Sequence, residues 1–189
     1  MSQYDSQVYV GGSGGVYRVT SDGLSSRVIW VDGHVKSACL NGGVIYTLVD
    51  KKDSGWTVRV YNSDYQLIRS WRHNDLFTIS NQLVVRKDSV IVPDRNSKTI
   101  IQYSLTGEVE RRILCRILKS APTWLCLTST RCNAVIVSCG DTVSAIDLRT
   151  GQFVWSTGSL ERPTAVCCDD ADRVDRKSTR LNSSHVRTS

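Results

Sequence analysis

The sequence is poor in the features that mark secreted, fibrous or membrane proteins. Only three prolines occur among 189 residues, which excludes a collagen-like or proline-rich chain. The opening residues MSQYDSQVYV show no basic segment followed by an apolar run, so no secretory signal is predicted. The longest apolar stretches, such as 134–137, are far shorter than the roughly 18 residues that cross a bilayer. We therefore expect a cytoplasmic protein without a membrane partner.

Patterns typical of enzymes and metal proteins are lacking as well. The chain has three histidines, and none stands in a motif with a nucleophilic serine or cysteine. None of its seven cysteines has the C-x-x-C spacing of a zinc site, and most have apolar neighbours, so reduced core thiols are expected. A strained disulfide between the adjacent Cys167 and Cys168 is the alternative. The sequence predicts no catalytic residue, metal ion, cofactor or small-molecule substrate.

The chain does contain a repeat with a period near 42 residues. Four segments each consist of an alternating apolar run, a short polar turn and a second alternating run, which is the pattern of a β-hairpin. Their turns centre on Gly23, Tyr65, Gly107 and Gly151, which are separated by 42, 42 and 44 residues. Glycine suits a turn that needs a positive φ. At Tyr65 we expect a turn built differently, around residues 62–64.

A second alternating hairpin precedes each of the last three, so each of these units holds four short strands. No helical pattern competes, because EVERRILCRILKS alternates well enough to supply the last strand of its unit. Four-stranded units at this period are typical of the blades of a β-propeller, and this all-β fold, with about four blades, is our prediction. A β-sandwich is the competing architecture, but it does not require turns at so regular a period.

Two hairpins carry a resemblance to known propeller repeats. AIDLRTGQFVWS resembles the quinoprotein-type repeat, with its pattern Ala-x-Asp-x-x-Thr-Gly-x-x-x-Trp, and SVIVPDRNSKTIIQYSLTGEV resembles the NHL-type repeat. The mixture is similar to the C-terminal propeller of tripartite-motif proteins, which carry a RING, a B-box and a coiled coil. That resemblance implies a non-catalytic module that binds protein or RNA within a larger, ubiquitin-ligase-type protein.

The repeat divides the chain into blades of unequal completeness. Three complete blades, a partial one and the start of another do not close a ring, so the chain is predicted to be a fragment of a propeller. The predicted segments are a partial first blade at 1–34, a second blade at 35–75, a third at 76–120, a fourth at 121–162 and the start of a fifth at 163–174.

The remaining segment, 175–189, shows no repeat pattern. Its residues DRKSTRLNSSH resemble the translation of a common sequencing-library adapter, so the segment is predicted to be non-biological; a basic disordered arm is the alternative. It holds four basic residues and one acid, and without them the formal net charge falls from +6 to +3. Overall basicity then gives no argument for a nucleic-acid partner.

Three other features have structural interpretations. The glycine-rich GGSGG at 11–15 lacks the spacing of a phosphate-binding loop and is predicted to be a tight connection between strands. Asp147 is expected to bond within its own turn rather than act as a base. The tryptophans are expected to fill the space between blades, and they are Trp30, Trp56, Trp71, Trp124 and Trp155.

One group of charged residues shares a face of the predicted propeller. The loop between the second and third strands of a blade and the connection between blades open on the same side, and here they hold eight cations against five acids. Such a face suits an acidic protein segment or a phosphate backbone, and an ordinary solvated surface is the alternative. The predicted binding residues, called the cationic rim below, are Lys51, Lys52, Arg72, His73, Arg95, Lys98, Arg116, Lys119 and Arg162.

Together these features predict a non-catalytic interaction propeller that binds a protein, with RNA as the alternative ligand, through the cationic rim. Two other functions remain open. A quinoprotein-like enzyme is favoured by the Thr-Gly-x-x-x-Trp pattern and the Cys167-Cys168 pair, but it would need a carboxylate cluster for calcium, which the sequence does not show. The other is a purely structural scaffold repeat.

Overall fold

The structure is a computed structural model of the chain. It describes residues 8–51, 55–72, 82–86, 88–94, 96–114, 122–128, 134–157, 160, 163–168 and 174–178. Two compact units are present, Met1–Phe77 and Thr78–Ser189, called unit 1 and unit 2 below. Every regular element in the described ranges is a β-strand, as the alternating sequence pattern predicts. Within these ranges no helix is long and apolar enough to span a membrane.

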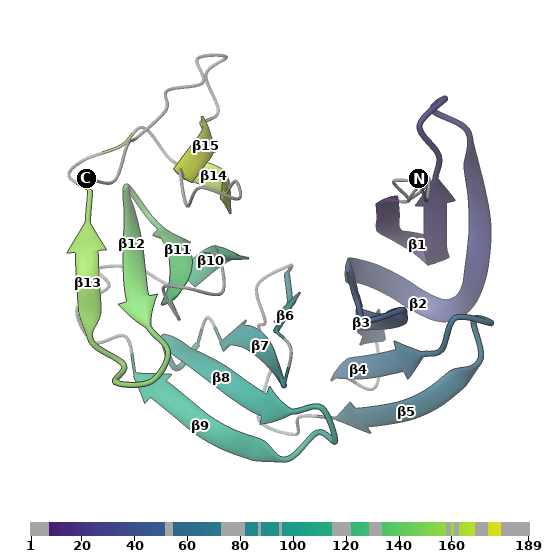
Figure 1. Cartoon of the computed structure of the whole chain (residues 1–189), viewed down its shortest axis with the longest axis horizontal. Helices are drawn as coiled ribbons and strands as arrows, with labels where there is room; N and C mark the ends of the chain where they lie inside the picture. Colours follow the sequence, from purple (N-terminus) through teal and green to yellow (C-terminus); the bar gives the residue numbers. More distant parts are fainter. Residues whose placement is uncertain are drawn as a thin grey trace, which may run out of the picture. The chain divides into compact units, whose positions relative to one another are not determined.

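Unit 1 contains one antiparallel sheet in which the strands lie in chain order (Figure 1). Its strands are β1 (Val8–Val19), β2 (Ser25–Asn41), β3 (Val44–Lys51), β4 (Gly55–Tyr61) and β5 (Leu67–Arg72). The long β2 pairs with β1 through its first half and with β3 through its second half. It therefore runs across residue 34, where we predicted the first blade to end, and the blade boundaries stay predictions.

The core of unit 1 follows from this double pairing of β2. Val16 of β1, Ile29 and Val35 of β2 and Ile45 of β3 are all almost fully buried and belong to one apolar cluster. Because side chains alternate between the two faces of a strand, the buried members of this cluster in β2 and in β3 stand two or four residues apart. The apolar residues that alternate in the sequence are thus residues that the sheet of unit 1 buries.

The glycine-rich segment 11–15 lies inside β1, which corrects the prediction of a separate connection between strands. The pairing of β1 with β2 shifts between Ser13 and Gly15, where β1 advances by two residues and β2 by four, from His34 to Trp30. A Cβ atom at Gly15 would collide with the carbonyl oxygen of Ile29, and one at Gly11 with that of Val35. The glycines therefore allow two backbones to approach closely, so the strand continues through them.

Unit 2 contains two four-stranded antiparallel sheets and one pair of strands, again in chain order (Figure 1). The first sheet is β6 (Val84–Val85), β7 (Ser89–Asp94), β8 (Thr99–Ser104) and β9 (Val109–Leu114). The second is β10 (Pro122–Leu127), β11 (Ala134–Cys139), β12 (Thr142–Asp147) and β13 (Phe153–Ser156). The pair is β14 (Pro163–Cys168) and β15 (Val174–Ser178). The strand expected in EVERRILCRILKS is β9.

Successive sheets of unit 2 pack against each other through apolar faces. Ile91 and Ile100 of the first sheet share a buried cluster with Leu125 and Val135 of the second. A further cluster joins the second sheet to the β14–β15 pair, and the tryptophans Trp124 and Trp155 pack against it. These two tryptophans occupy the space between sheets, as predicted.

The end of the described chain reaches into the segment predicted to be adapter-derived. The backbone of β15 extends to Ser178 and pairs with β14, for example at Ala165 and Lys177. Residues 179–189 lie outside the described residues. The non-biological origin of 175–189 stays a prediction.

The four turns used to find the repeat share one backbone conformation. The residue at the centre of each turn has a positive φ, of 82° at Gly23, 63° at Tyr65, 95° at Gly107 and 75° at Gly151. An L-residue other than glycine pays roughly 1–2 kcal/mol for this conformation. The positive φ explains why three of the four turns have glycine at this position. Tyr65 adopts the same conformation, so other contacts must offset its cost.

The turn at Tyr65 has the same backbone hydrogen bonds as the glycine turns at 23 and 107, which corrects the prediction that it is built differently. Its side-chain acceptor is Asn62, in the position that Ser104 holds in the Gly107 turn. The Oδ1 atom of Asn62 accepts hydrogen bonds from the backbone N–H groups of Asp64 at 3.1 Å and Gln66 at 2.8 Å. The Tyr65 side chain packs against the core of unit 1. Burial and a hydrogen bond with Tyr65 raise the pKa of Tyr9 to about 12. These contacts offset the strain of the left-handed tyrosine.

Candidate functional site

Three of the nine cationic-rim residues lie in the described part of the chain, and two of them are in unit 1. Lys51 ends β3 and Arg72 ends β5, on either side of the first residues of β4, so both stand at the same edge of the sheet. The Nζ atom of Lys51 lies 2.8 Å from Oδ2 of Asp32, and this contact lowers the pKa of Asp32. The charge of Lys51 is therefore already partly balanced, whereas Arg72 is exposed.

The third rim residue, Lys98, lies exposed in the turn between β7 and β8 of unit 2. Asp94 organises this turn, because its carboxylate accepts a hydrogen bond from the backbone N–H of Asn96 at 3.0 Å and another from the Ser97 hydroxyl. Lys98 itself has a φ of 51°. The other predicted rim residues lie outside the described residues, and they are Lys52, His73, Arg95, Arg116, Lys119 and Arg162. The rim as a binding surface stays a prediction.

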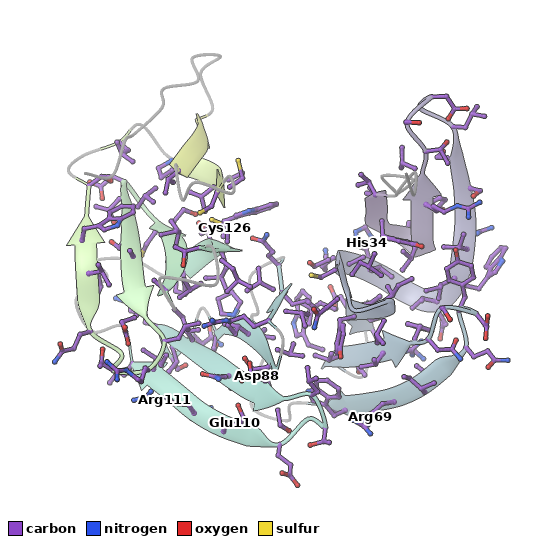
Figure 2. All side chains as sticks on the ribbon, in the orientation of Figure 1. His34, Arg69, Asp88, Glu110, Arg111 and Cys126 are labelled. Carbon is purple, nitrogen blue, oxygen red and sulfur yellow. The ribbon has the colours of Figure 1, made fainter. Side chains whose placement is uncertain are left out.

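A polar pocket lies at the opposite edge of the unit 2 sheets from Lys98. It has a volume of about 350 Å³ and is formed where the first sheet meets the turn between β12 and β13 of the second. We call it the arginine pocket; its lining residues are Arg86, Asp88, Ser89, Gln102, Glu110, Arg111, Leu148 and Arg149. Asp88, Glu110 and Arg111 are labelled in Figure 2.

Arg111 connects the two sheets at this pocket. Its Nη1 atom donates a hydrogen bond to the carbonyl oxygen of Leu148 at 2.9 Å and another to that of Arg149. Arg111 belongs to β9, whereas the two acceptors lie in the β12–β13 turn. Hydrogen bonds from a charged donor are stronger than those between neutral groups. The guanidinium therefore holds the turn against the first sheet and shapes the pocket wall.

Asp147 fixes the conformation of the same turn. Its Oδ1 atom accepts hydrogen bonds from the backbone N–H groups of Arg149 at 2.8 Å and Thr150 at 2.6 Å. The bond from the backbone of Thr150 makes the largest contribution to lowering the pKa of Asp147. This confirms that Asp147 bonds within its own turn. Its effect on the pocket is indirect, because the turn it organises carries Leu148 and Arg149.

The charges around the pocket are of both signs. Three guanidinium groups and two carboxylates line it, so its formal charge is one positive unit. The amide nitrogen Nε2 of Gln102 donates to Oε2 of Glu110 at 3.3 Å, which occupies part of one carboxylate. Arginine matches the planar geometry of carboxylate and phosphate groups. The pocket therefore offers donors for an anion together with acceptors for a nearby N–H group.

The hydroxyl of Ser89 is the second unusual feature of the pocket. Ser89 begins β7 and is only 1% exposed, yet its Oγ atom has no hydrogen-bond partner among the described residues. A buried polar group without a partner costs roughly 1–3 kcal/mol. A buried group of this kind calls for an explanation, such as backbone strain, a bound water or ion, or a functional role. Ser89 is also one of the residues that line the pocket.

Substituting alanine for Ser89 is expected to stabilise the unliganded protein. The change removes a buried, unpaired hydroxyl and leaves the backbone bond from Arg86 N–H to the Ser89 carbonyl oxygen at 2.8 Å in place. We expect a gain of roughly 1 kcal/mol, or a rise in Tm of about 2–4 °C, in thermal unfolding. A matched Ser144→Ala change should destabilise instead, because the Ser144 hydroxyl contacts Ser156 at 2.9 Å. Equal losses in both variants would contradict this account.

Sequence reasoning missed the arginine pocket because it considered one edge of the predicted blades only. The excess of cations directed attention to the rim, while Arg86, Arg111 and Arg149 lie on three separate segments. The positions of two of these arginines relative to the turn glycines nevertheless indicated that they lie close together. Arg111 follows the turn glycine Gly107 and Arg149 precedes Gly151, so both stand at the same edge of consecutive repeats.

One tryptophan does not fill the space between sheets, which corrects the prediction for Trp30. Its side chain is 74% exposed, and the Cζ atom of Arg27 lies 3.1 Å from the centre of its ring. The Arg27 guanidinium also lies 6.0 Å from the ring of Tyr17. This is a cation–π cluster on the surface of unit 1. Separately, no group of three or more histidine, cysteine, aspartate or glutamate side chains in the described ranges is arranged to hold a metal ion.

Comparison with known proteins identifies the architecture. No protein-family model and no curated protein matches the chain. Among solved structures, the WD40 β-propeller domain of Doa1 matches with a TM-score of 0.57 and 16% identity, over 92% of this chain and 72% of that one. The WD40 domain of Pan2 from Neurospora crassa matches with a TM-score of 0.62 and 10% identity, over 80% of this chain and 46% of that one. The fold is a β-propeller.

A third similar structure is the computationally designed protein Ika8, with a TM-score of 0.58 and 19% identity. The match covers 93% of this chain and 53% of Ika8. The chain thus spans about half the length of Ika8 and of the Pan2 domain. At these identities the comparisons establish the propeller fold, and they agree with the repeat found in the sequence.

Proposed function

We propose that this propeller is a non-catalytic interaction module that binds a protein segment, with an acidic side chain of the partner seated in the arginine pocket. The observation that carries the proposal is the pocket itself, where three arginines and Ser89, whose buried hydroxyl has no hydrogen-bond partner among the described residues, line one cavity of about 350 Å³. A rigid sheet scaffold that positions loop residues around a shared edge is typical of binding propellers. WD40 propellers among the similar structures support the same reading.

The mixed charge of the pocket favours protein over RNA as the partner. A phosphate backbone brings negative charge at every nucleotide, so it would meet Asp88 and Glu110 as well as the arginines. A peptide segment can place one carboxylate against the arginines and its own N–H groups against these acids. Opposite charges arranged in this way also select the partner, because a mismatched ligand leaves charges unpaired.

Two further parts of the proposal rest on the sequence. The cationic rim is proposed as a second contact surface because of its excess of cations in the sequence, and Arg72 and Lys98 are exposed, each within its own unit. The NHL-like and quinoprotein-like repeats support a place in a larger protein of the tripartite-motif kind, with a ligase module elsewhere in its chain. The full-length transcript tests that part, since a RING and B-box upstream would support it and a secreted eight-bladed enzyme would contradict it.

The binding partner's class can be tested by screening two probe sets against the full chain. One set is an array of short peptides in which the central residue is glutamate, phosphoserine, alanine or lysine. The other is a library of single-stranded RNA oligonucleotides. We expect retention of peptides with a central glutamate or phosphoserine, reduced in an Arg86→Ala, Arg149→Ala double variant. Binding of RNA alone, or of peptides regardless of the central residue, would contradict the proposal.

A further inference from the structure

Two cysteines from different sheets of unit 2 face each other. Cys126 lies on β10 and Cys168 on β14, and their Sγ atoms are 2.8 Å apart. Both side chains are half-buried and pack against the same apolar cluster between these sheets (Cys126 is labelled in Figure 2). The sulfur atoms are therefore already closer than ordinary non-bonded contact, with each thiol in a fixed position. This contact is independent of the arginine pocket.

The alternation along β14 explains why Cys168, and not Cys167, makes this contact. Val166 is buried and Cys168 half-buried on the inner face, while Cys167 between them is exposed. Successive side chains of a strand point to opposite faces. Cys168 is therefore directed at β10, and its sulfur partner is 42 residues away in sequence rather than the next residue.

We propose that Cys126 and Cys168 form a reversible disulfide that links the second sheet of unit 2 to the β14–β15 pair. Disulfides require the two Cβ atoms to stand roughly 3.5–4.5 Å apart with their S–H groups directed at each other. The contact between the two sulfurs meets the second condition on packed strands. The sequence offered the adjacent Cys167-Cys168 ring as the alternative, but the inner-face contact of Cys168 favours Cys126 instead.

The reaction is thiol–disulfide exchange with a low-molecular-weight disulfide such as oxidised glutathione. The Cys168 thiolate attacks one sulfur of the reagent, forms a mixed disulfide and releases one thiolate. Cys126 then loses its proton to solvent and its sulfur attacks Cys168 Sγ, forming the Cys126–Cys168 bond and releasing the second thiol. Two protein thiols are oxidised, and the reagent is reduced to two thiols.

The surroundings of the two cysteines favour slow formation of the Cys126–Cys168 disulfide over reaction of Cys126 with oxidants in general. The hydrogen bond with Cys168, followed by burial, raises the pKa of the Cys126 thiol. Cys126 is thus the resolving group that reacts once its neighbour carries the mixed disulfide. Since the thiolate is the nucleophile, Cys126 alone would be a poor target for an oxidant. Its reactivity depends on Cys168 being held beside it.

Closing this bond should stabilise unit 2. In the chain-entropy picture, a loop of about 40 residues removes a large part of the unfolded chain's freedom. We expect the oxidised protein to melt roughly 5–10 °C above the reduced protein, with the difference absent in Cys126→Ser. A Cys39→Ser variant in unit 1 should keep it, because Cys39 is remote in sequence and lies in another sheet.

The direct test is peptide mapping of the full chain after incubation in a glutathione buffer, under native conditions and without reductant. Trypsin releases Cys126 in the peptide 120–131 and Cys168 in 150–173, because the bond between Arg162 and Pro163 resists cleavage. We expect these two peptides joined as one species. The species should persist in Cys167→Ser and vanish in Cys168→Ser and in urea.

A cross-link that survives Cys168→Ser but vanishes in Cys167→Ser would overturn the proposal. So would an internal bond within 150–173, or mixed glutathione adducts without any joined peptide. Because the Cys167→Ser control changes an exposed side chain, a failure to fold in that variant is not expected, and the melting curve of each variant verifies it.

Discussion

Replacing Arg111 by alanine should weaken binding of an acidic peptide by about 10- to 100-fold, which corresponds to roughly 1.4–2.8 kcal/mol. The substitution removes one of three pocket cations and also releases the β12–β13 turn, because the bonds to the Leu148 and Arg149 carbonyl oxygens are lost. The expected stability loss is about 2 kcal/mol, which is typical of a charged hydrogen bond. Fluorescence anisotropy of a labelled peptide and thermal unfolding measure the two effects.

Two variants separate the role of the guanidinium from that of charge alone. Arg111→Lys keeps the charge but cannot donate to two carbonyl oxygens from one planar group, so it should recover little of the loss. Arg112→Ala removes the neighbouring arginine on β9, which is exposed and does not line the pocket. It should leave peptide affinity within about twofold, which is the size of surface effects. Equal losses at Arg111 and Arg112 would show that only general charge matters.

Replacing Leu125 by alanine should produce the largest loss of stability, about 3 kcal/mol, as is typical for a fully buried leucine. Leu125 is 0% exposed and lies in the cluster between the first and second sheets of unit 2, with Ile91 and Ile146. Its backbone N–H also donates to Oε1 of Gln82 at 2.8 Å, which the substitution leaves intact. The cavity between two sheets cannot close without moving both, so Tm should fall by roughly 6–12 °C.

The control for Leu125 is Val154→Ala on β13. Val154 is 59% exposed, so its truncation should change the unfolding free energy by less than about 0.5 kcal/mol. If the Leu125→Ala protein had the same Tm as the parent chain, the two sheets would not pack through this cluster. That result would contradict the blade-on-blade packing of unit 2.

The fold could be predicted from the sequence because its signals are local. Alternating apolar and polar residues predict the strands, and Gly23, Gly107 and Gly151 predict the turns, where the structure has a positive φ. Both signals depend on neighbours within a few residues. Even the exception at Tyr65 was signalled by Asn62, whose side chain bonds its own turn. The continuation of β1 through its glycines was not predicted, because the close approach of Gly15 to Ile29 depends on a partner strand.

The site could not be predicted in the same way, because its parts come from different repeats. The contact of Arg111 with the carbonyl oxygens of 148–149 joins residues 37 and 38 positions apart, and its existence depends on how two sheets pack. The unpaired hydroxyl of Ser89 has no sequence signature, since burial and bonding are properties of the packed structure. Composition likewise could not show that Trp30 lies exposed beneath Arg27.

The central claim is that the arginine pocket of unit 2 binds an acidic protein segment and that Ser89 is kept unpaired for that ligand. The most direct measurement is the affinity of a glutamate-containing peptide for the parent chain and for Ser89→Ala, with the melting temperature of each sample recorded. The account predicts that Ser89→Ala melts higher and binds the peptide about 5- to 10-fold more weakly, as expected for one lost hydrogen bond. A variant that is more stable and binds the peptide with unchanged affinity would contradict it.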